Sequence, residues 1–297
     1  MELRVLKYFV TIAEEGNFTK AAKELHVTQP VLSRQITSLE DELGVQLLER
    51  GKRKATLTEA GILFRKRAES MLELAERTEK EMADIKNDFA GEIVIGTAES
   101  SAQKIIPDII SSFQKMYPNT RYRLIAGTAD QIEEKMDAGA IDIGMLLEPV
   151  KLDGYEYIRF PYPERSVVLM RADDILAKKD YLTADDVKNL PLLLPDRKEI
   201  LQNTEKALGI PMRKLNVIAT HNLISNAAFF VEKGLGYAIT IEGSILNYDR
   251  ERFAYVPLHL EVYTNSVLVW KKNGVFNPAV RKFIDYIIML FEHNNKC

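Results

Sequence analysis

The sequence has little of the chemistry that disulfides, metal sites and membrane spans require. It contains one cysteine, Cys297, and four histidines in 297 residues. A single cysteine cannot form an intrachain disulfide, and the histidines show no metal-ligand spacing. No run approaches the length of a membrane-spanning helix, since the most apolar stretch spans only about nine residues and carries Asp285. We therefore expect no metal, no cofactor and no membrane partner, and a protein of the reducing cytoplasm without a signal peptide.

Catalytic motifs are missing as well. The sequence has no G-x-S-x-G and no P-loop, and Gly234-Leu235-Gly236 fails the G-x-G-x-x-G pattern because Ile239 stands at the last glycine. The lone cysteine has no plausible catalytic partner nearby. The net charge of −3 gives no whole-chain attraction for a polyanion. We therefore expect that the protein is not an enzyme. Turnover of a substrate would favour the rival interpretation as an enzyme.

Glycine and proline are scarce in the first 90 residues, where Pro30 is the one proline. From Gly91 onward, short β-branched runs alternate with helical patterns, which is typical of βαβ units and a parallel sheet. Hydrophobic residues make up 46% and charged residues 28%, as in globular proteins. This change in composition and pattern predicts an α/β protein of about two domains with a boundary near residues 89–91.

The first 45 residues predict three helices. Leu3, Leu6 and Val10 recur at helical spacing until Gly16-Asn17 ends the first helix. A second, shorter helix has Thr19 as its expected N-cap, and a third begins after Thr28. Two short helices, a tight turn and a third helix are typical of a helix-turn-helix.

The third helix has one aliphatic face and one polar face. At about 100° per residue, Leu32, Ile36 and Leu39 share one side. The opposite side carries an amide, hydroxyls and a guanidinium, which suit base edges and phosphates in the major groove. An ordinary solvated helix face is the alternative, and periodicity alone does not decide between them. The predicted DNA contacts here are Thr28, Gln29, Pro30, Ser33 and Arg34.

Four cations follow within five residues, with Gly51 permitting a turn between the first and second. They are placed where the wing of a winged helix would lie along the phosphate backbone. The alternative is a solvated charged loop, which is the more common structure for a run of basic residues. Residues 1–57 hold nine basic and eight acidic groups, so any attraction must come from this local patch. The predicted phosphate contacts are Arg50, Lys52, Arg53 and Lys54.

Residues 58–89 predict one long helix capped by Thr56 or Thr58. At about 1.5 Å per residue, it would be roughly 48 Å long. Its inward positions alternate spacings of four and three, as in a heptad seam. A homodimer through this seam is the economical interpretation, and packing on the chain's own second domain is the alternative. The seam is Phe64, Ala68, Met71, Ala75, Thr78, Met82, Ile85 and Phe89.

The segments FTKAAKELHVTQPVLSRQITSLEDELGVQLLER (18–50) and RKATLTEAG (53–61) resemble the LysR-type transcriptional regulators. The stretches YPNTRYRL, AGAIDIGM and VEKGLGYAI are similar, more loosely, to the effector domain of that family. The resemblance implies a DNA-binding transcriptional regulator, modulated by a small-molecule effector and acting on double-stranded DNA as a homodimer or homotetramer. A purely architectural DNA-binding dimer, which would ignore metabolites, is the alternative.

The fold that the resemblance implies has three parts. These are a winged helix-turn-helix over residues 1–57, a linker helix over 58–90, and a two-lobed effector domain over 91–297 similar to periplasmic binding proteins. Lobe I would comprise about 91–161 and 266–297, and lobe II about 162–265. Leu48 stands where the family usually has Phe. Thr240 and Ile241 depart from the family pattern at a strand end that often borders the ligand cleft.

Hydroxyl groups and helix N-termini gather at several predicted strand ends, where α/β sheets bind ligands. A helix N-terminus suits a carboxylate, so we expect an organic anion as effector. Plain N-capping is the competing explanation for these hydroxyls. His221 is expected to cap a helix rather than to bind a ligand, and Arg197 could equally be a surface residue. The predicted effector contacts are Thr97, Ser100, Ser101, Thr128, Arg197, Asn222 and Thr240.

Overall fold

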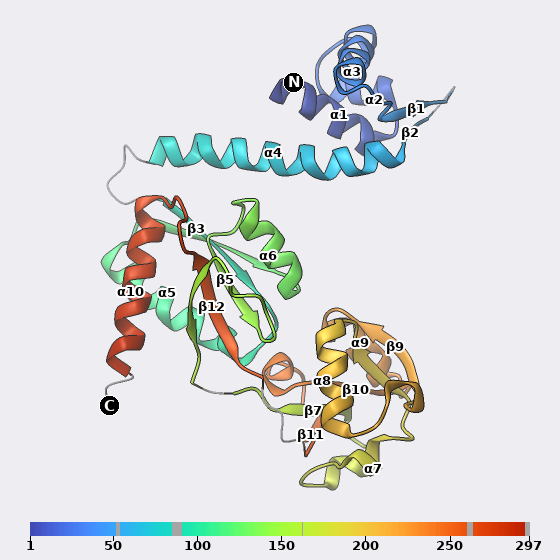
Figure 1. Cartoon of the computed structure of the whole chain (residues 1–297), viewed down its shortest axis with the longest axis vertical. Helices are drawn as coiled ribbons and strands as arrows, with labels where there is room; N and C mark the ends of the chain where they lie inside the picture. The colour runs from blue at the N-terminus through green and yellow to red at the C-terminus, as the bar shows by residue number, and fades with distance from the viewer. Residues whose placement is uncertain (52–53, 85–90, 162, 260–263, 295–297) are drawn as a thin grey trace. The chain divides into compact units, whose positions relative to one another are not determined.

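A computed structural model describes residues 1–51, 54–84, 91–161, 163–259 and 264–294 (Figure 1). The chain divides into two compact units, Met1–Lys86 and Asn87–Cys297. Each unit has hydrophobic clusters of its own.

Three helices build the first unit: α1 (Leu3–Glu15), α2 (Phe18–Glu24) and α3 (Gln29–Leu43). Phe9, Leu32 and Ile36 are fully buried between them, as the aliphatic faces predict. Gly16 ends α1 with φ of 59°, a left-handed conformation that favours glycine. The cap predicted for α2 is wrong, because the side chain of Asn17, not Thr19, accepts hydrogen bonds from the first helical N–H groups at 2.9 and 3.0 Å.

A short hairpin follows the three helices. β1 (Leu48–Arg50) and β2 (Ala55–Leu57) pair antiparallel, in the place predicted for a wing. The Gly51 N–H donates to the Lys54 carbonyl at 2.9 Å and closes the turn. Lys52 and Arg53, two of the predicted phosphate contacts, lie outside the described residues.

α4 (Glu59–Asp84) is the long helix that the sequence predicts. Thr58 caps it, since its hydroxyl accepts from the Gly61 N–H at 2.9 Å. Gly61 lies so close to the hairpin that a Cβ there would be 2.0 Å from the Leu47 carbonyl oxygen. Only glycine fits at this position without displacing the backbone of the hairpin.

The predicted seam of α4 is used in two ways. Phe64 packs edge-on against Phe9 with ring centroids 5.1 Å apart, and Ala68 is fully buried in the same cluster. These two positions therefore serve the unit's own core, which the sequence interpretation did not expect. Farther along, Met71 and Met82 are 41% and 55% exposed. Ile85 and Phe89 lie outside the described residues.

The second unit contains two five-stranded sheets. In the first, β3 pairs in parallel with β4 and β5, while β12 returns from the far end of the chain and pairs antiparallel with β5 and β6. The strand order is β4-β3-β5-β12-β6. The strands are β3 (Gly91–Thr97), β4 (Thr120–Ala126), β5 (Ile143–Leu147), β6 (Tyr155–Arg159) and β12 (Ser266–Lys271).

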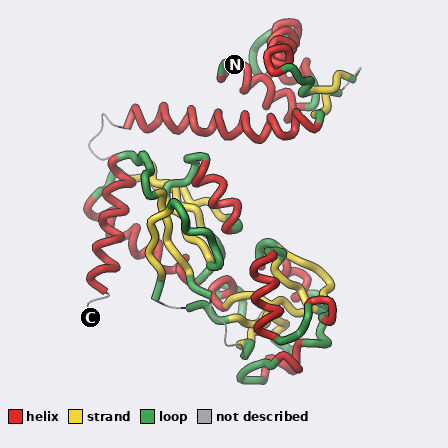
Figure 2. Tube along the Cα trace, viewed as in Figure 1, coloured by secondary structure: helices red, strands yellow, loops and turns green. Residues whose placement is uncertain are grey.

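Helices cover both faces of this sheet (Figure 2). α5 (Ile105–Met116) and α10 (Pro278–Asn294) pack on one face, against Ile93 and Ile95 of β3. α6 (Ala129–Asp137) packs on the other face, against Val94. The alternation follows from the two-residue period of a strand. A short 3₁₀ helix, η1 (Ser101–Lys104), leads into α5, and we call this sheet with its helices lobe I.

The second sheet has the order β11-β7-β10-β8-β9. Its strands are β7 (Ser166–Arg171), β8 (Leu192–Pro195), β9 (Val217–His221), β10 (Tyr237–Ile241) and β11 (Phe253–Pro257). One cluster joins it to α7 (Ala184–Val187) and α8 (Lys198–Leu208), and another joins it to α9 (Ile224–Glu232). The connections include η2 (Ile175–Lys178), η3 (Met212–Lys214) and η4 (Glu242–Ile245). We call this sheet with its helices lobe II.

The chain passes between the lobes twice, and the two passages meet in a bridge between Glu164 and Thr264. Glu164 is 3% exposed. Its carboxyl oxygens accept from the Ser101 N–H at 2.6 Å, the Ser101 hydroxyl at 2.5 Å and the Gly243 N–H at 3.2 Å. Because Ser101 lies in η1 and Gly243 in η4, one buried side chain joins lobe I to lobe II.

Candidate functional site

The first candidate site is the polar face of α3. Leu32, Ile36 and Leu39 fix the opposite face in the core, each at most 2% exposed. Gln29 and Arg34 are exposed on the outer face. The predicted contacts therefore occupy one accessible surface at the N-terminal end of the helix. The remaining members are Thr28 and Pro30, both exposed, and the partly exposed Ser33.

The wing is attached to α3 by a carboxyl group that the sequence interpretation did not single out. Glu40 is 8% exposed, and its Oε1 accepts from the N–H groups of Leu47 and Leu48 at 2.8 and 3.0 Å. These donors lie immediately before and at the start of β1. Two charge-assisted hydrogen bonds thus set the position of the hairpin relative to α3. A glutamate on a charged stretch gave no sequence signal for this role.

Of the four predicted phosphate contacts, two lie in described parts of the hairpin. Arg50 is the last residue of β1, and Lys54 is exposed just before β2. Both therefore belong to the same hairpin that Glu40 attaches to α3. A cation on such a hairpin can bind phosphate while α3 lies in the groove.

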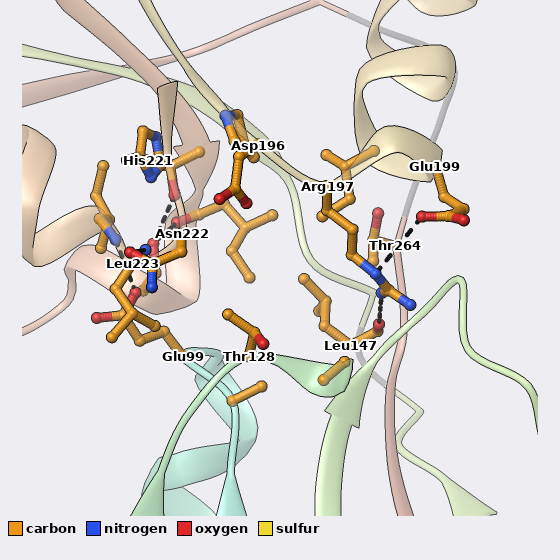
Figure 3. A pocket seen from close by; sticks show the side chains of 18 of the residues that line it. Glu99, Thr128, Leu147, Asp196, Arg197, Glu199, His221, Asn222, Leu223 and Thr264 are labelled. Carbon is orange, nitrogen blue, oxygen red and sulfur yellow. Dashed lines mark hydrogen bonds and ion pairs between the residues drawn. The ribbon is translucent and has the colours of Figure 1, made fainter. Parts of the chain in front are cut away.

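The second candidate site is a cavity of about 570 Å³ in the second unit, a size typical of small-molecule sites. Its walls come from both lobes: the ends of β3, β4 and β5 in lobe I, and the ends of β8, β9 and β10 in lobe II. Figure 3 shows Glu99, Asp196, His221 and Asn222 on one side of the view, with Arg197, Glu199 and Thr264 on the other. The cavity thus lies at strand ends, where the sequence analysis places the effector.

The structure brings four of the predicted effector contacts together, because Thr128, Arg197, Asn222 and Thr240 line this cavity. Thr97, Ser100 and Ser101 are not among its lining residues. Ser100 is 1% exposed, and Ser101 donates both its N–H and its hydroxyl to Glu164. Ser101 therefore belongs to the junction between the lobes, a role that depends on a residue 63 positions away, and Ser100 is buried next to it.

Two of the helix N-termini at the cavity, those of α6 and α9, are capped from within the chain, whereas α8 begins after Arg197 without a side-chain cap. Thr128 and Gln131 form a reciprocal capping box at the start of α6, at 3.0 and 3.3 Å. At the start of α9, Glu99 of lobe I accepts from the Ile224 N–H at 2.9 Å. Burial raises the pKa of Glu99, and hydrogen bonds from the backbone of Ile224 and Ser225 oppose that shift. The N–H groups of Gln131 and Ile224 are thus engaged within the chain, and the start of α8 is the one of these three termini that no side chain caps.

Arg197, the predicted anion partner, is likewise occupied. Its guanidinium lies 3.1 Å from an Asp130 oxygen and 3.7 Å from a Glu199 oxygen. It also donates to the Leu147 carbonyl at 3.5 Å. Asp130 belongs to lobe I and Arg197 to lobe II, so this pair is a further contact between the lobes. The arginine is neither a free surface residue nor an unpaired cation.

His221 ends β9 and lies in the wall of the cavity. It does not cap α9 as the sequence interpretation expects, because α9 begins at Ile224 after Leu223. The side chain is 8% exposed, and neither ring nitrogen has a hydrogen-bond partner within the described part of the chain. Burial lowers the pKa of His221, although the nearby Asp196 carboxylate and a backbone contact with Leu223 act in the opposite direction. The ring is therefore neutral at neutral pH.

Neither a metal site nor a membrane span emerges from the described ranges. They contain no group of three His, Cys, Asp or Glu side chains placed to hold a metal ion. No helix within them is long and apolar enough to cross a membrane.

The comparisons with known proteins match both parts of the chain. A family model for the bacterial regulatory helix-turn-helix protein of the lysR family matches residues 3–62, and one for the LysR substrate binding domain matches residues 86–291. The Hca operon transcriptional activator HcaR of Escherichia coli (strain K12) is 32% identical over 295 residues, covering 96% of each chain. The transcriptional regulator AlsR of Bacillus subtilis (strain 168) is 34% identical over 298 residues, covering 96% of this chain and 94% of AlsR.

A solved structure extends the likeness to the whole fold. Full-length CbnR complexed with its target DNA superimposes with a TM-score of 0.76 at 25% identity, covering 97% of this chain and 99% of that one. The matched relatives are regulators rather than enzymes. The resemblance that the sequence motifs indicate is confirmed, and the chain belongs to the LysR family of DNA-binding, effector-responsive transcriptional regulators.

Proposed function

We propose that α3 reads bases in the major groove while the β1–β2 hairpin holds the phosphate backbone. The supporting observation is that Gln29, Pro30 and Arg34 share one exposed face, with Thr28 at its start. Gln can form a bidentate pair with adenine and Arg with guanine. The cations Arg50, Lys52, Arg53 and Lys54 add affinity that does not depend on sequence. Since its partner is genomic DNA, the protein works in the cytoplasm.

We propose further that two copies associate through the exposed part of α4, and that such dimers can pair into tetramers. Met71, Leu74 and Met82 are each at least 41% exposed on a helix whose first turns are already packed. A helix with an apolar stripe that has no cover within its own unit gains from burying it against a second copy. Two helix-turn-helix domains in one dimer would then bind two half-sites.

The effector, we propose, occupies the cavity between the lobes. A cavity of about 570 Å³, lined from both lobes, carries this assignment. A ligand that contacts both walls favours one arrangement of the lobes, and that preference can change operator binding by a coupling of about 1–3 kcal/mol.

Operator binding measured with and without a panel of small metabolites tests this function. A cavity-filling variant, Ala207→Phe, is compared with Ala138→Phe, which changes an exposed alanine at the end of α6. We expect both variants to bind operator, and only the first to lose the metabolite response. A response that survives Ala207→Phe would place the effector elsewhere, and substrate turnover would reject the assignment as a regulator.

A further inference from the structure

The charged groups around the cavity are not balanced. Five carboxylates line it: Glu99, Asp130, Glu148, Asp196 and Glu199. The cations in the same wall are Arg197 and the exposed Lys198. The sequence interpretation expects an organic anion here, and such a ligand would meet more charge of its own sign than of the opposite sign.

Three of these carboxylates form ion pairs with two arginines. Arg197 pairs with Asp130 and Glu199, and Arg159, from outside the cavity, lies 2.6 Å from a Glu148 oxygen. Glu99 and Asp196 have no cation within ion-pair distance in the described ranges. The uncompensated negative charge therefore collects at the His221 side of the cavity (Figure 3).

One further polar group on the lobe II side, Thr240, favours a hydrogen-bond donor as ligand. The Ser244 hydroxyl donates to the Ile241 carbonyl at 2.8 Å, so the Thr240 hydroxyl, 2.8 Å from Ser244, must donate to it. Thr240 then presents only lone pairs to the cavity. His221, buried and without a hydrogen-bond partner in the described ranges, adds one ring acceptor and one N–H donor in the same wall.

An anion at the His221 side of the cavity would lie beside two carboxylates that no cation pairs among the described residues, and the exposed Lys198 is the one lysine in the wall. The starts of α6 and α9 are capped by Gln131 and Glu99, and the Arg197 guanidinium is ion-paired with Asp130 and Glu199, while its Nε has no hydrogen-bond partner in the described ranges. A cation would gain from the two unpaired carboxylates, which face the cavity from opposite lobes. Such a pair is only partly screened by water because both carboxylates lie in a concave wall.

We propose that the effector carries an ammonium or amidinium group, which Glu99 of lobe I and Asp196 of lobe II bind at the His221 side of the cavity. This inference rests on the proposed function, in which the cavity is the effector site. A cation held by both carboxylates joins the lobes without displacing Glu99 from the start of α9, because a carboxylate has lone pairs for both roles.

The test uses three four-carbon probes of matched length: butane-1,4-diamine, butane-1,4-diol and succinate. Each is titrated calorimetrically into the full-length protein at constant ionic strength. We expect the diamine to bind more tightly than the diol and the diol more tightly than succinate. Asp196→Asn and Glu99→Gln should each weaken diamine binding about tenfold, which corresponds to about 1.4 kcal/mol. Both variants should improve succinate binding.

Two controls make the result specific. Glu99→Gln keeps an oxygen that can cap α9, and the fluorescence of Trp270, buried in β12, shows that the second unit of each variant folds. Asp185→Asn removes an exposed carboxylate of α7 that does not line the cavity, and it should leave diamine binding unchanged. Equal effects of Asp185→Asn and Asp196→Asn would overturn the proposal, as would failure of the diamine to bind at millimolar concentration.

A fourth variant separates this inference from the proposed function. If succinate binds more tightly than the diamine and Ala207→Phe abolishes that binding, the cavity remains the effector site and the cationic class is rejected. If diamine binding survives Ala207→Phe, the diamine binds outside the cavity, and the roles given to Glu99 and Asp196 are wrong.

Discussion

Glu164→Ala should destabilise the second unit strongly, because Glu164 is the buried acceptor between the lobes. The substitution removes the partner of two backbone N–H groups, those of Ser101 and Gly243, and of the Ser101 hydroxyl. The hydroxyl can rotate to another acceptor, but the two N–H groups cannot. Each buried donor left without a partner costs about 1–3 kcal/mol. We therefore expect the free energy of unfolding to fall by about 2–6 kcal/mol. The lower end of that range applies if water reaches the site and accepts from these N–H groups.

The single tryptophan makes this measurement specific to the second unit. Trp270 lies in β12, is 4% exposed and is the only tryptophan of the chain. Its fluorescence in a urea titration therefore follows unfolding of the second unit within the full-length protein. For a unit of about 200 residues, the same loss lowers Tm by about 2–4 °C per kcal/mol.

The control for Glu164→Ala is Glu251→Ala, which truncates an exposed glutamate of the same unit. Surface changes of this kind usually alter stability by less than about 0.5 kcal/mol. Glu164→Gln, which keeps one acceptor oxygen and loses the other, should fall between the two variants. If the urea midpoint of Glu164→Ala matches that of Glu251→Ala, the hydrogen bonds of Glu164 do not hold the lobes together.

Four further outcomes follow from the structure. Gln29→Ala and Arg34→Ala should each relax base preference at one operator position at a cost of about 1–3 kcal/mol, whereas equal losses on operator and scrambled DNA would exclude base contacts. Met71→Glu should yield monomers in sedimentation, because a dimer would bury an unpaired carboxylate; an intact dimer would show that the copies associate elsewhere. Gly61→Ala should lower the thermal stability of the first unit, since its Cβ would be 2.0 Å from the Leu47 oxygen. Because burial lowers the pKa of His221, the unfolded state binds the extra proton, and stability should fall as the pH drops below about 6.5; His221→Gln should flatten that slope.

The helices of the first unit could be predicted because their signals are local. Gly16 and Gly44 end helices in left-handed conformations, and the three-to-four spacing of apolar residues sets the buried face of α3. The alternation of strands and helices likewise predicts the parallel pairing of β3, β4 and β5. The cap of α2 was missed because Asn17 and Thr19 are both good caps and lie two residues apart.

The parts of the site that could not be predicted depend on partners far along the chain. In the sequence, Ser101 looks like a free N-cap. In the structure, Glu164, 63 residues later, accepts hydrogen bonds from its N–H and its hydroxyl. The start of α9 likewise looks like an anion site in the sequence. In the structure, Glu99, 125 residues earlier, accepts a hydrogen bond from its first N–H group. The seam of α4 shows an apolar stripe, but a stripe does not say which of its turns pack on α1. Tertiary structure decides which of several possible partners a residue contacts, and the periodicity of a sequence carries no information about that choice.

The attachment of the wing to α3 by Glu40 has a consequence for how operators are distinguished. Because both hydrogen bonds from β1 end on a side chain of α3, the groove-facing helix and the start of the hairpin keep one separation. A DNA sequence whose groove does not match that separation cannot be accommodated by a shift of the protein. The DNA itself must bend or change its groove width, and the energy needed depends on the stiffness of its base steps. Selection among operators is therefore expected to extend to base pairs that no side chain touches.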